Sequence, residues 1–240
     1  MQSLKAQSHA FFDLAFVKAM PPEKQSECLS MLSASSSQLR QDLFAFVMLD
    51  FKKDGFFVEF GATDGVSLSN SYVMETGFGW SGILAEPARD WHDDLKANRK
   101  ATIETRCVWR KSAEKISFTE APRGEHSSVT SYVSNSRRRR GKSYDVETIS
   151  LNDLLTQHNA PHVIDYLSVD TEGSEYEIMK TVDFDEHQFN VMTIEHNDAP
   201  ERTEMQALLA VASTGERNTL IFWKRWSVGN EVSYQDLLFG

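Results

Sequence analysis

Val58-Glu59-Phe60-Gly61-Ala62-Thr63-Asp64-Gly65 is the stretch of sequence that decides the fold of this chain. It completes an apolar run, Phe56–Phe60, that lies between Gly55 and Gly61 and is typical of a buried parallel strand. A helical pattern begins soon afterwards, near Ser67. A strand, a tight glycine turn and a helix N-terminus together form a cradle for a small ligand at the carboxyl edge of a sheet.

Glu59 indicates which ligand this cradle takes. A carboxylate at a strand end accepts hydrogen bonds from the hydroxyls or amino group of a nucleoside-like cofactor, and it repels a pyrophosphate. The glycine spacing is Gly-x-x-x-Gly rather than Gly-x-Gly-x-x-Gly, and no Gly-Lys-Ser/Thr follows. The dinucleotide fingerprint and the phosphate-binding Walker loop are therefore both absent.

Strand and helix patterns alternate outward from this stretch. The further strand patterns lie at residues 82–85, 103–108, 163–169 and 191–194, with edge strands at 116–119 and 146–149 and a closing antiparallel pair at 219–226 and 231–234. Residues 120–143 have the composition of a long mobile insertion. The alternation predicts an α/β fold whose mostly parallel sheet is covered by helices on both faces.

The chain divides into a short helical extension, residues 1–36, and a main domain, residues 37–240. The helical pattern of the extension is broken at Pro21-Pro22. Its apolar stripe favours packing against the main domain over contact with a membrane, and a lid over the active site is the alternative.

Composition is that of an ordinary globular protein, with 40% hydrophobic and 25% charged residues among 240. The longest apolar run, residues 43–49, is too short to span a bilayer, and no secretory signal pattern opens the sequence. Cys28 and Cys107 are too few for a disulfide framework. We therefore expect a reducing, cytoplasmic setting.

A formal net charge of −10 opposes general affinity for nucleic acid. The local exception is a run of cations, Arg137, Arg138, Arg139, Arg140 and Lys142. We interpret the run as a solvated loop. The alternative is a clamp for an anionic substrate, such as a phosphorylated sugar or a nucleotide-linked glycan.

Polar residues end four of the predicted parallel strands: Glu59, Glu86, Asp170 and the run 195–197. Because the carboxyl ends of parallel strands meet at one edge of a sheet, we expect these groups to line one ligand site. Glu86, at the end of the next strand after Glu59, is suited to accept hydrogen bonds from the two ribose hydroxyls of an adenosine. The alternative role for Glu86 is that of an acid at the N-terminus of the following helix.

Asp170, Glu172 and His196 are the candidate catalytic residues. Asp170, Glu195 and His196 form a ligand set suited to Mg²⁺ or Mn²⁺, which would lower the pKa of a substrate hydroxyl. The alternative is that these acids orient loops or face water. Glu172 or His196 is the candidate general base. The remaining histidines, His126 among them, show no metal-ligand spacing and are expected to be surface or structural residues.

The combined order and spacing of these motifs resembles the FkbM family of S-adenosylmethionine-dependent methyltransferases. The resemblance rests on residues 37–38, 41–42, 57–66, 68–70, 80–87, 150–155, 165–173, 175 and 194–195. Two positions depart from the family pattern: Arg40 stands where the family often carries glycine, and Ser168 stands where it often carries lysine before the Asp-x-Glu-Gly motif.

The resemblance implies a class I methyltransferase, with a Rossmann-like, mostly parallel, seven-stranded sheet and S-adenosylmethionine over the ends of the first two strands. The cofactor-binding residues expected on this basis and from the strand-end pattern are Glu59, Gly61, Ala62, Thr63, Asp64, Gly65, Ser69, Asn70, Glu86, Pro87, Cys107, Val108 and Asp170. Ser69 and Asn70 would meet the amino-acid moiety, and Cys107 and Val108 the adenine.

The resemblance also implies O-methylation of hydroxyls on sugars, glycolipids or polyketides. Methyl transfer is an in-line displacement from a sulfonium, so the protein mainly aligns the donor and activates an oxygen. A sheet edge lined by carboxylates suits such a cationic donor. The two rival functions are an RNA 2′-O-methyltransferase, supported by the arginine run alone, and a cofactor-binding protein without catalysis.

Overall fold

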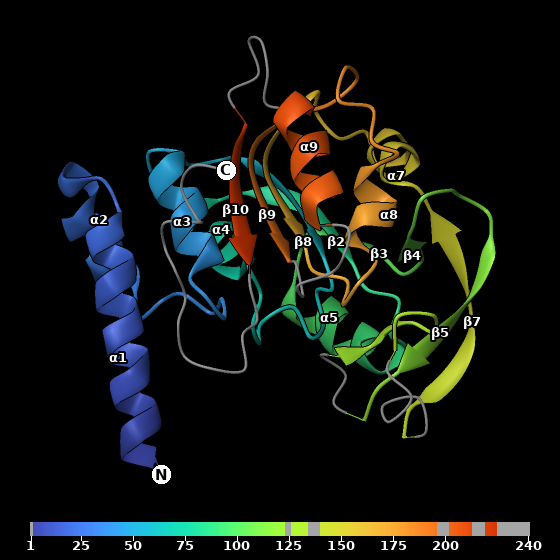
Figure 1. Cartoon of the computed structure of the whole chain (residues 1–240), viewed down its shortest axis with the longest axis horizontal. Coiled ribbons are helices and arrows are strands. Elements are labelled where there is room, and N and C mark those ends of the chain that lie inside the picture. The colour runs from blue at the N-terminus through green and yellow to red at the C-terminus, as the bar shows by residue number, and fades with distance from the viewer. Residues whose placement is uncertain (1, 123–125, 134–139, 196–201, 213–218, 225–240) are drawn as a thin grey trace.

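The computed structural model describes residues 2–122, 126–133, 140–195, 202–212 and 219–224. Its helices are α1 (Gln2–Ala19), η1 (Pro22–Lys24), α2 (Gln25–Met31), α3 (Gln41–Met48), α4 (Tyr72–Phe78), η2 (Arg89–Trp91), α5 (His92–Asn98), α7 (Leu151–Gln157), α8 (Glu175–Met179) and α9 (Arg202–Ala212). Figure 1 shows a main sheet at the centre of the molecule and a smaller sheet beside it.

The main sheet has the strand order β10-β9-β8-β1-β2-β3, and every pairing in it is parallel. Its strands are β1 (Phe56–Phe60), β2 (Ser81–Ala85), β3 (Thr102–Glu104), β8 (Val163–Val169), β9 (Gln188–Glu195) and β10 (Leu220–Lys224). This is the doubly wound order of a Rossmann-like sheet, and it reverses between β1 and β8. Ligands bind at the carboxyl edge beside such a reversal.

The predicted count of seven strands is not confirmed, because the described residues contribute six strands to this sheet. The last predicted strand, residues 231–234, lies outside the described ranges. β10 pairs in parallel with β9, from Leu220 beside Val191 to Lys224 beside Glu195.

A second sheet, of four strands in the order β4-β7-β5-β6, corrects the predictions for residues 103–149. Its strands are β4 (Cys107–Val108), β5 (Lys115–Glu120), β6 (Ser128–Val129) and β7 (Lys142–Ile149). The single strand predicted at 103–108 is wrong: the chain turns at Arg106, whose backbone N–H and guanidinium both donate to the Glu104 carboxylate at 2.9 Å. The predicted edge strands at 116–119 and 146–149 pair with each other in this second sheet. Within the predicted mobile insertion, β6 pairs with β5.

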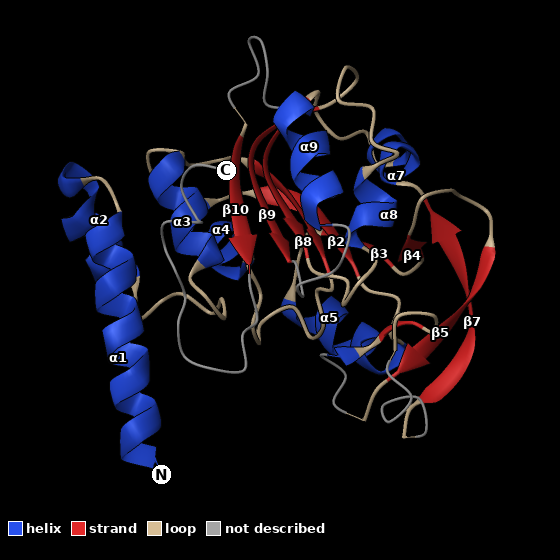
Figure 2. Cartoon of the chain, viewed as in Figure 1, coloured by secondary structure: helices blue, strands red, loops and turns tan. Residues whose placement is uncertain are grey.

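Alternate residues of the central strands supply two different cores. Phe57, Leu84, Tyr166 and Val191 belong to a cluster shared with the helices from α1 to α5. Val58, Ile83, Leu167 and Met192 belong to a cluster shared with α7, α8 and α9, which Figure 2 shows grouped beside the sheet. Because successive side chains of a strand point to opposite faces, the sequence pattern of continuous apolar strands is explained by burial on both sides.

The N-terminal helices pack on the main domain, as their apolar stripe predicted. Phe16 and Cys28 are fully buried in the first of these two clusters. Arg40, which precedes α3, has a left-handed backbone with φ of 60° and forms an ion pair with Asp13 of α1 at 2.8 Å. This conformation is the physical reason that glycine suits the position, and the ion pair offsets part of its cost for arginine.

Two further sequence predictions concern Cys28, Cys107 and the membrane. Both cysteines are buried and free. No helix in the described part of the chain is long and apolar enough to cross a membrane. Arg137, Arg138 and Arg139 lie outside the described residues, and Arg140 is exposed.

Candidate active site

The turn after β1 is packed directly against the end of β8. Gly61 has a φ of 74°, and a Cβ atom added there would lie 2.3 Å from the carbonyl oxygen of Asp170. The backbone N–H groups of Gly61 and Ala62 both donate to the carbonyl oxygen of Ala85, at 3.0 and 3.4 Å. The carboxyl ends of β1, β2 and β8 therefore meet at this turn, as the strand-end pattern predicted.

The Glu59 carboxylate holds the loop that follows this turn. It is 2% exposed and accepts hydrogen bonds from Ser69 Oγ at 3.0 Å, from the backbone N–H of Asn70 at 2.7 Å and from Ser71 Oγ at 2.5 Å. The sequence predicted that Glu59, Ser69 and Asn70 share one site, and the structure brings them together. Glu59 fixes the loop through these donors, a role that sequence alone did not identify.

Asn70 links this loop to two other segments. Its side-chain oxygen accepts from Ser37 Oγ at 2.9 Å, and its side-chain nitrogen donates to Ser168 Oγ at 2.9 Å. Ser168, where the family pattern often has lysine, is buried and serves here as a hydrogen-bond partner. The departure at this position replaces a cation with a neutral contact.

Glu86 follows the last residue of β2 and lies at the edge of the site. Its two carboxylate oxygens accept from the backbone N–H groups of Thr63 and Ala88, each at 2.8 Å. Burial, with the charge of the nearby Glu120 as a smaller cause, raises the pKa of Glu86 from its ordinary value of 4.5 to about 7, although the hydrogen bonds from Ala88 and Thr63 act to lower it. The bond to Ala88 matches the predicted alternative of an acid before a helix, and the bond to Thr63 ties Glu86 to the glycine turn.

Asp64 and Gly65 complete the turn. Asp64 accepts from the backbone N–H groups of Val66 and Ser67 at 2.8 and 2.7 Å, which closes the loop on itself. Gly65 has a φ of 78°, and a Cβ there would meet the side chains of Arg99 and Leu95 at 2.5 and 2.7 Å.

Arg99, which was not predicted as a site residue, is buried and stabilises the loop between β1 and α4. The Arg99 side chain has 0% exposure and pairs with Glu75 at 3.1 Å. It also donates to the carbonyl oxygen of Gly65 and to Ser71 Oγ, both at 2.9 Å. The sequence gives little indication that Arg99 is buried, because an arginine at the end of an amphipathic helix is ordinarily solvated.

The residues predicted for the adenine side, Cys107 and Val108, are buried in β4 of the second sheet. Burial raises the pKa of Cys107 to about 12, with the charge of Glu86 as a further cause. Cys107 is therefore a neutral thiol with no nucleophilic character. Pro87 contributes its carbonyl oxygen to the hydroxyl of Tyr144 at 3.5 Å.

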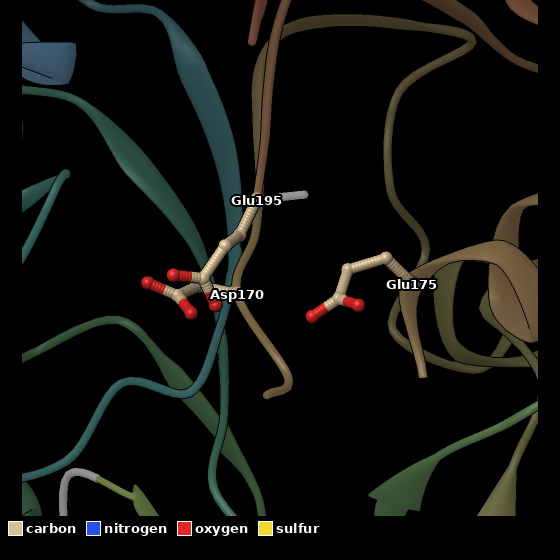
Figure 3. Close-up of side chains that lie close together, drawn as sticks. All are labelled: Asp170, Glu175 and Glu195. Carbon is tan, nitrogen blue, oxygen red and sulfur yellow. The ribbon is translucent and has the colours of Figure 1, made fainter. Parts of the chain in front are cut away.

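Three carboxylates gather at the ends of β8 and β9: Asp170, Glu175 and Glu195, each with an oxygen within 4.8 Å of the others (Figure 3). Asp170 and Glu195 were predicted to lie together, and they do. Glu175, at the start of α8, was not predicted as a site residue. Its carboxylate accepts from the backbone N–H groups of Thr171 and Gly173 at 2.9 and 3.1 Å, and burial followed by the charge of Asp170 raises its pKa. The predicted ligand His196 lies outside the described residues.

The candidate base Glu172 has a partner that sequence reasoning set aside. Glu172 has a left-handed φ of 58°, and its carboxylate lies 3.0 Å from Nδ1 of His126. His126 lies just before β6 of the second sheet, 46 residues earlier in the chain than Glu172. The spacing carries no motif, so the pair is visible only in three dimensions.

Comparison with known protein families matches residues 59–220 to the methyltransferase FkbM domain. The match begins near the end of β1 and stops at the first residue of β10, so it includes β2, β3, β8 and β9 of the main sheet, the second sheet and the acidic cluster. No curated protein and no solved structure matches this chain.

Proposed function

Because this chain belongs to the FkbM methyltransferase family, and is therefore a methyltransferase, we propose that it moves a methyl group from S-adenosylmethionine to a hydroxyl of a sugar, glycan, glycolipid or polyketide-type molecule. The observation that carries this proposal is the convergence of Glu59, Glu86 and Asp170 on one glycine turn at the reversal of strand order. That is the position where doubly wound sheets bind nucleoside-like ligands.

The residues at this edge fit S-adenosylmethionine in charge and in backbone shape. Gly61 lets the turn after β1 pass close to the backbone carbonyl oxygen of Asp170, where any side chain would collide, and this brings the ends of β1 and β8 together at the edge. Carboxylates suit both a sulfonium cation and ribose hydroxyls, and the described edge residues bring several of them together. S-adenosylmethionine supplies, when bound, an electrophilic methyl group next to a good leaving group.

The proposed division of roles follows the contacts. Glu86 would accept hydrogen bonds from the ribose hydroxyls, since its oxygens retain acceptor capacity beyond the two backbone N–H groups. Gly61, Ala62, Thr63, Asp64 and Gly65 would form the wall of the cofactor site. Ser69 and Asn70 would stand on the methionine side, Pro87, Cys107 and Val108 on the adenine side, and Asp170 beside the reacting atoms.

Activation of the acceptor hydroxyl by Mg²⁺ or Mn²⁺ is part of the proposal, supported by the three carboxylates of Asp170, Glu175 and Glu195. Oxygen ligands of this kind are those that both ions prefer. We expect EDTA to lower methyl transfer at least tenfold and added Mg²⁺ or Mn²⁺ to restore it. Full activity after exhaustive chelation would show that methyl transfer needs no metal ion, and it would not affect the proposed methyl transfer to a hydroxyl.

The function is tested by incubating the protein with S-adenosylmethionine carrying an isotopically labelled methyl group and an extract of host glycans and metabolites. We expect mass spectrometry to find the label as O-methyl groups on small hydroxyl compounds. Including phosphorylated sugars and their neutral counterparts tests whether the run Arg137, Arg138, Arg139 and Arg140 selects anionic acceptors. Label in RNA alone would favour the rival 2′-O-methyltransferase, and transfer to nitrogen would contradict the proposal.

Glu86→Gln provides a test of the proposed ribose contact. Hydrogen bonds to a charged group contribute about 1.5–3 kcal/mol each, so we expect S-adenosylhomocysteine to bind about tenfold to a hundredfold more weakly. Isothermal titration calorimetry at pH 8, where wild-type Glu86 is ionised, measures this. Glu147→Gln, on the exposed face of β7, is the matched control and should bind normally. Unchanged affinity in Glu86→Gln would show that Glu86 does not bind the ribose.

The same variant should alter the pH dependence of stability. Folding raises the pKa of Glu86 from 4.5 to about 7, so the folded state holds this proton more tightly than the unfolded state. Stability from this group is therefore present at low pH and lost as pH rises from about 4.5 through about 7. Between those values the unfolding free energy of the wild type should fall relative to that of Glu86→Gln, by up to about 1.4 kcal/mol per pH unit. Urea unfolding at several pH values measures the difference.

A further inference from the structure

A segment of the second sheet is fastened to the loop that follows β8. Ser128 Oγ donates to the carbonyl oxygens of Thr171 and Glu172 at 3.3 and 3.1 Å. The ring of Tyr132 packs on Gly173, where an added Cβ would lie 3.1 Å from it. These contacts, together with that between His126 and Glu172, place residues 126–132 over the residues that follow Asp170.

The contact between His126 and Glu172 fixes the chemical state of the imidazole ring. A carboxylate only accepts hydrogen bonds, so the 3.0 Å contact requires the proton of the neutral ring to be on Nδ1. Nε2 then carries a lone pair and is a proton acceptor. The His126 side chain is 37% exposed, and the described residues give Nε2 no hydrogen-bond partner.

The position of this pair is at the carboxyl edge of the main sheet. Glu172 is two residues from Asp170, whose carbonyl oxygen lies against the Gly61 turn. Three buried carboxylates of the same edge, Glu59, Glu86 and Glu175, each accept hydrogen bonds from at least two donors of the protein. The left-handed backbone of Glu172 is a strained conformation for a residue with a side chain, and it aims the carboxylate at His126.

We propose that His126 is the general base of methyl transfer and that Glu172 is the residue that positions its ring. This inference rests on the proposed O-methyltransferase function. Nε2 of His126 takes the proton of the acceptor hydroxyl as the oxygen forms its bond to the methyl carbon. The bond between that carbon and sulfur breaks and leaves its electron pair on sulfur, which gives neutral S-adenosylhomocysteine. The imidazolium, stabilised by Glu172, then releases its proton to water.

His126→Asn tests the role of the base, because asparagine retains a donor for Glu172 and has no group that takes a proton near neutral pH. With labelled S-adenosylmethionine and p-nitrophenyl glycosides, or the extract compound found in the screen above, we expect kcat to fall about 10²- to 10⁴-fold with little change in KM. Protonation of an imidazole base lowers the rate as the pH is lowered between about pH 8 and 5, which gives the pH–rate profile an acid limb. In His126→Asn this acid limb should disappear. In Glu172→Gln the limb should persist, because the imidazole is retained, and kcat should fall because the carboxylate no longer orients the ring.

Ser128→Ala is the control for a purely structural role of His126. It removes the hydrogen bonds from Ser128 that also hold residues 126–132 on the loop after β8. We expect it to retain the acid limb and to lose less than tenfold in kcat. Equal losses in Ser128→Ala and His126→Asn, with the limb retained in both, would overturn His126 as the base. Oxygen methylation at the wild-type rate by His126→Asn would overturn it too. Wild-type transfer to nitrogen or to no compound would instead refute the proposed function.

The ring state can be measured without any acceptor. Long-range ¹H–¹⁵N NMR spectra of the full chain at pH 8 should show His126 protonated at Nδ1, and Glu172→Gln should shift the ring toward the Nε2-protonated form. A wild-type ring protonated at Nε2 would contradict the inference, whatever the acceptor is.

Discussion

Gly61→Ala is expected to abolish binding of S-adenosylhomocysteine and to lower the free energy of unfolding by about 2–5 kcal/mol. The left-handed φ of 74° costs a residue with a side chain about 1–2 kcal/mol. The added Cβ would lie 2.3 Å from the carbonyl oxygen of Asp170, a backbone atom that cannot yield unless the end of β8 moves. Overpacking of this kind costs about 1–3 kcal/mol more. Because β1 and β8 flank the proposed site, the displacement should disrupt it directly.

Calorimetry and urea unfolding measure the two effects of Gly61→Ala. Gly77→Ala is the matched control: Gly77 lies in α4, where an added Cβ meets its nearest neighbour at an ordinary 3.7 Å. Since glycine inside a helix is destabilising relative to alanine, this control should be stabilised by about 0.5–1 kcal/mol and should bind normally. Wild-type affinity in Gly61→Ala would show that the cofactor does not sit at this edge.

Arg99→Met is expected to lower the free energy of unfolding by about 3–5 kcal/mol. Removing one partner of a buried ion pair leaves the other charge uncompensated, and Glu75, on the other side of the pair, is only 9% exposed. The substitution also leaves the carbonyl oxygen of Gly65 and the hydroxyl of Ser71 without this donor. The loop between β1 and α4 should therefore loosen, and cofactor affinity should fall with stability.

Arg110→Met is the matched control for Arg99→Met. Arg110 pairs with Glu177 at 3.0 Å but its side chain is 51% exposed, so the change should cost less than about 1 kcal/mol. In the double variant Arg99→Met with Glu75→Gln, part of the loss should be recovered because the uncompensated charge is gone. A loss below about 1 kcal/mol in Arg99→Met alone is the result that would contradict a structural role for this ion pair.

The second sheet shows where sequence patterns stop predicting the fold. Residues 103–108 are predicted as one strand, yet they contribute to β3 and β4 in two different sheets. The break depends on a turn in which Arg106 pairs with Glu104, and on His158 of α7, whose Nε2 lies 3.2 Å from the same carboxylate. A partner from so distant a segment cannot be inferred from a local pattern.

The sequence by itself determined the parallel strands and the glycine turn after β1, and it placed Glu59, Glu86 and Asp170 together at one edge. Apolar periodicity and glycine spacing are local properties of the sequence, and they do not depend on the paths of the loops. Only the tertiary structure decided that Glu59 and Arg99 hold the loop, that Glu175 joins Asp170 and Glu195, and that His126 reaches Glu172. Those contacts depend on the paths of loops and on which polar groups must be satisfied when buried, and neither is encoded in the spacing of residues along the chain.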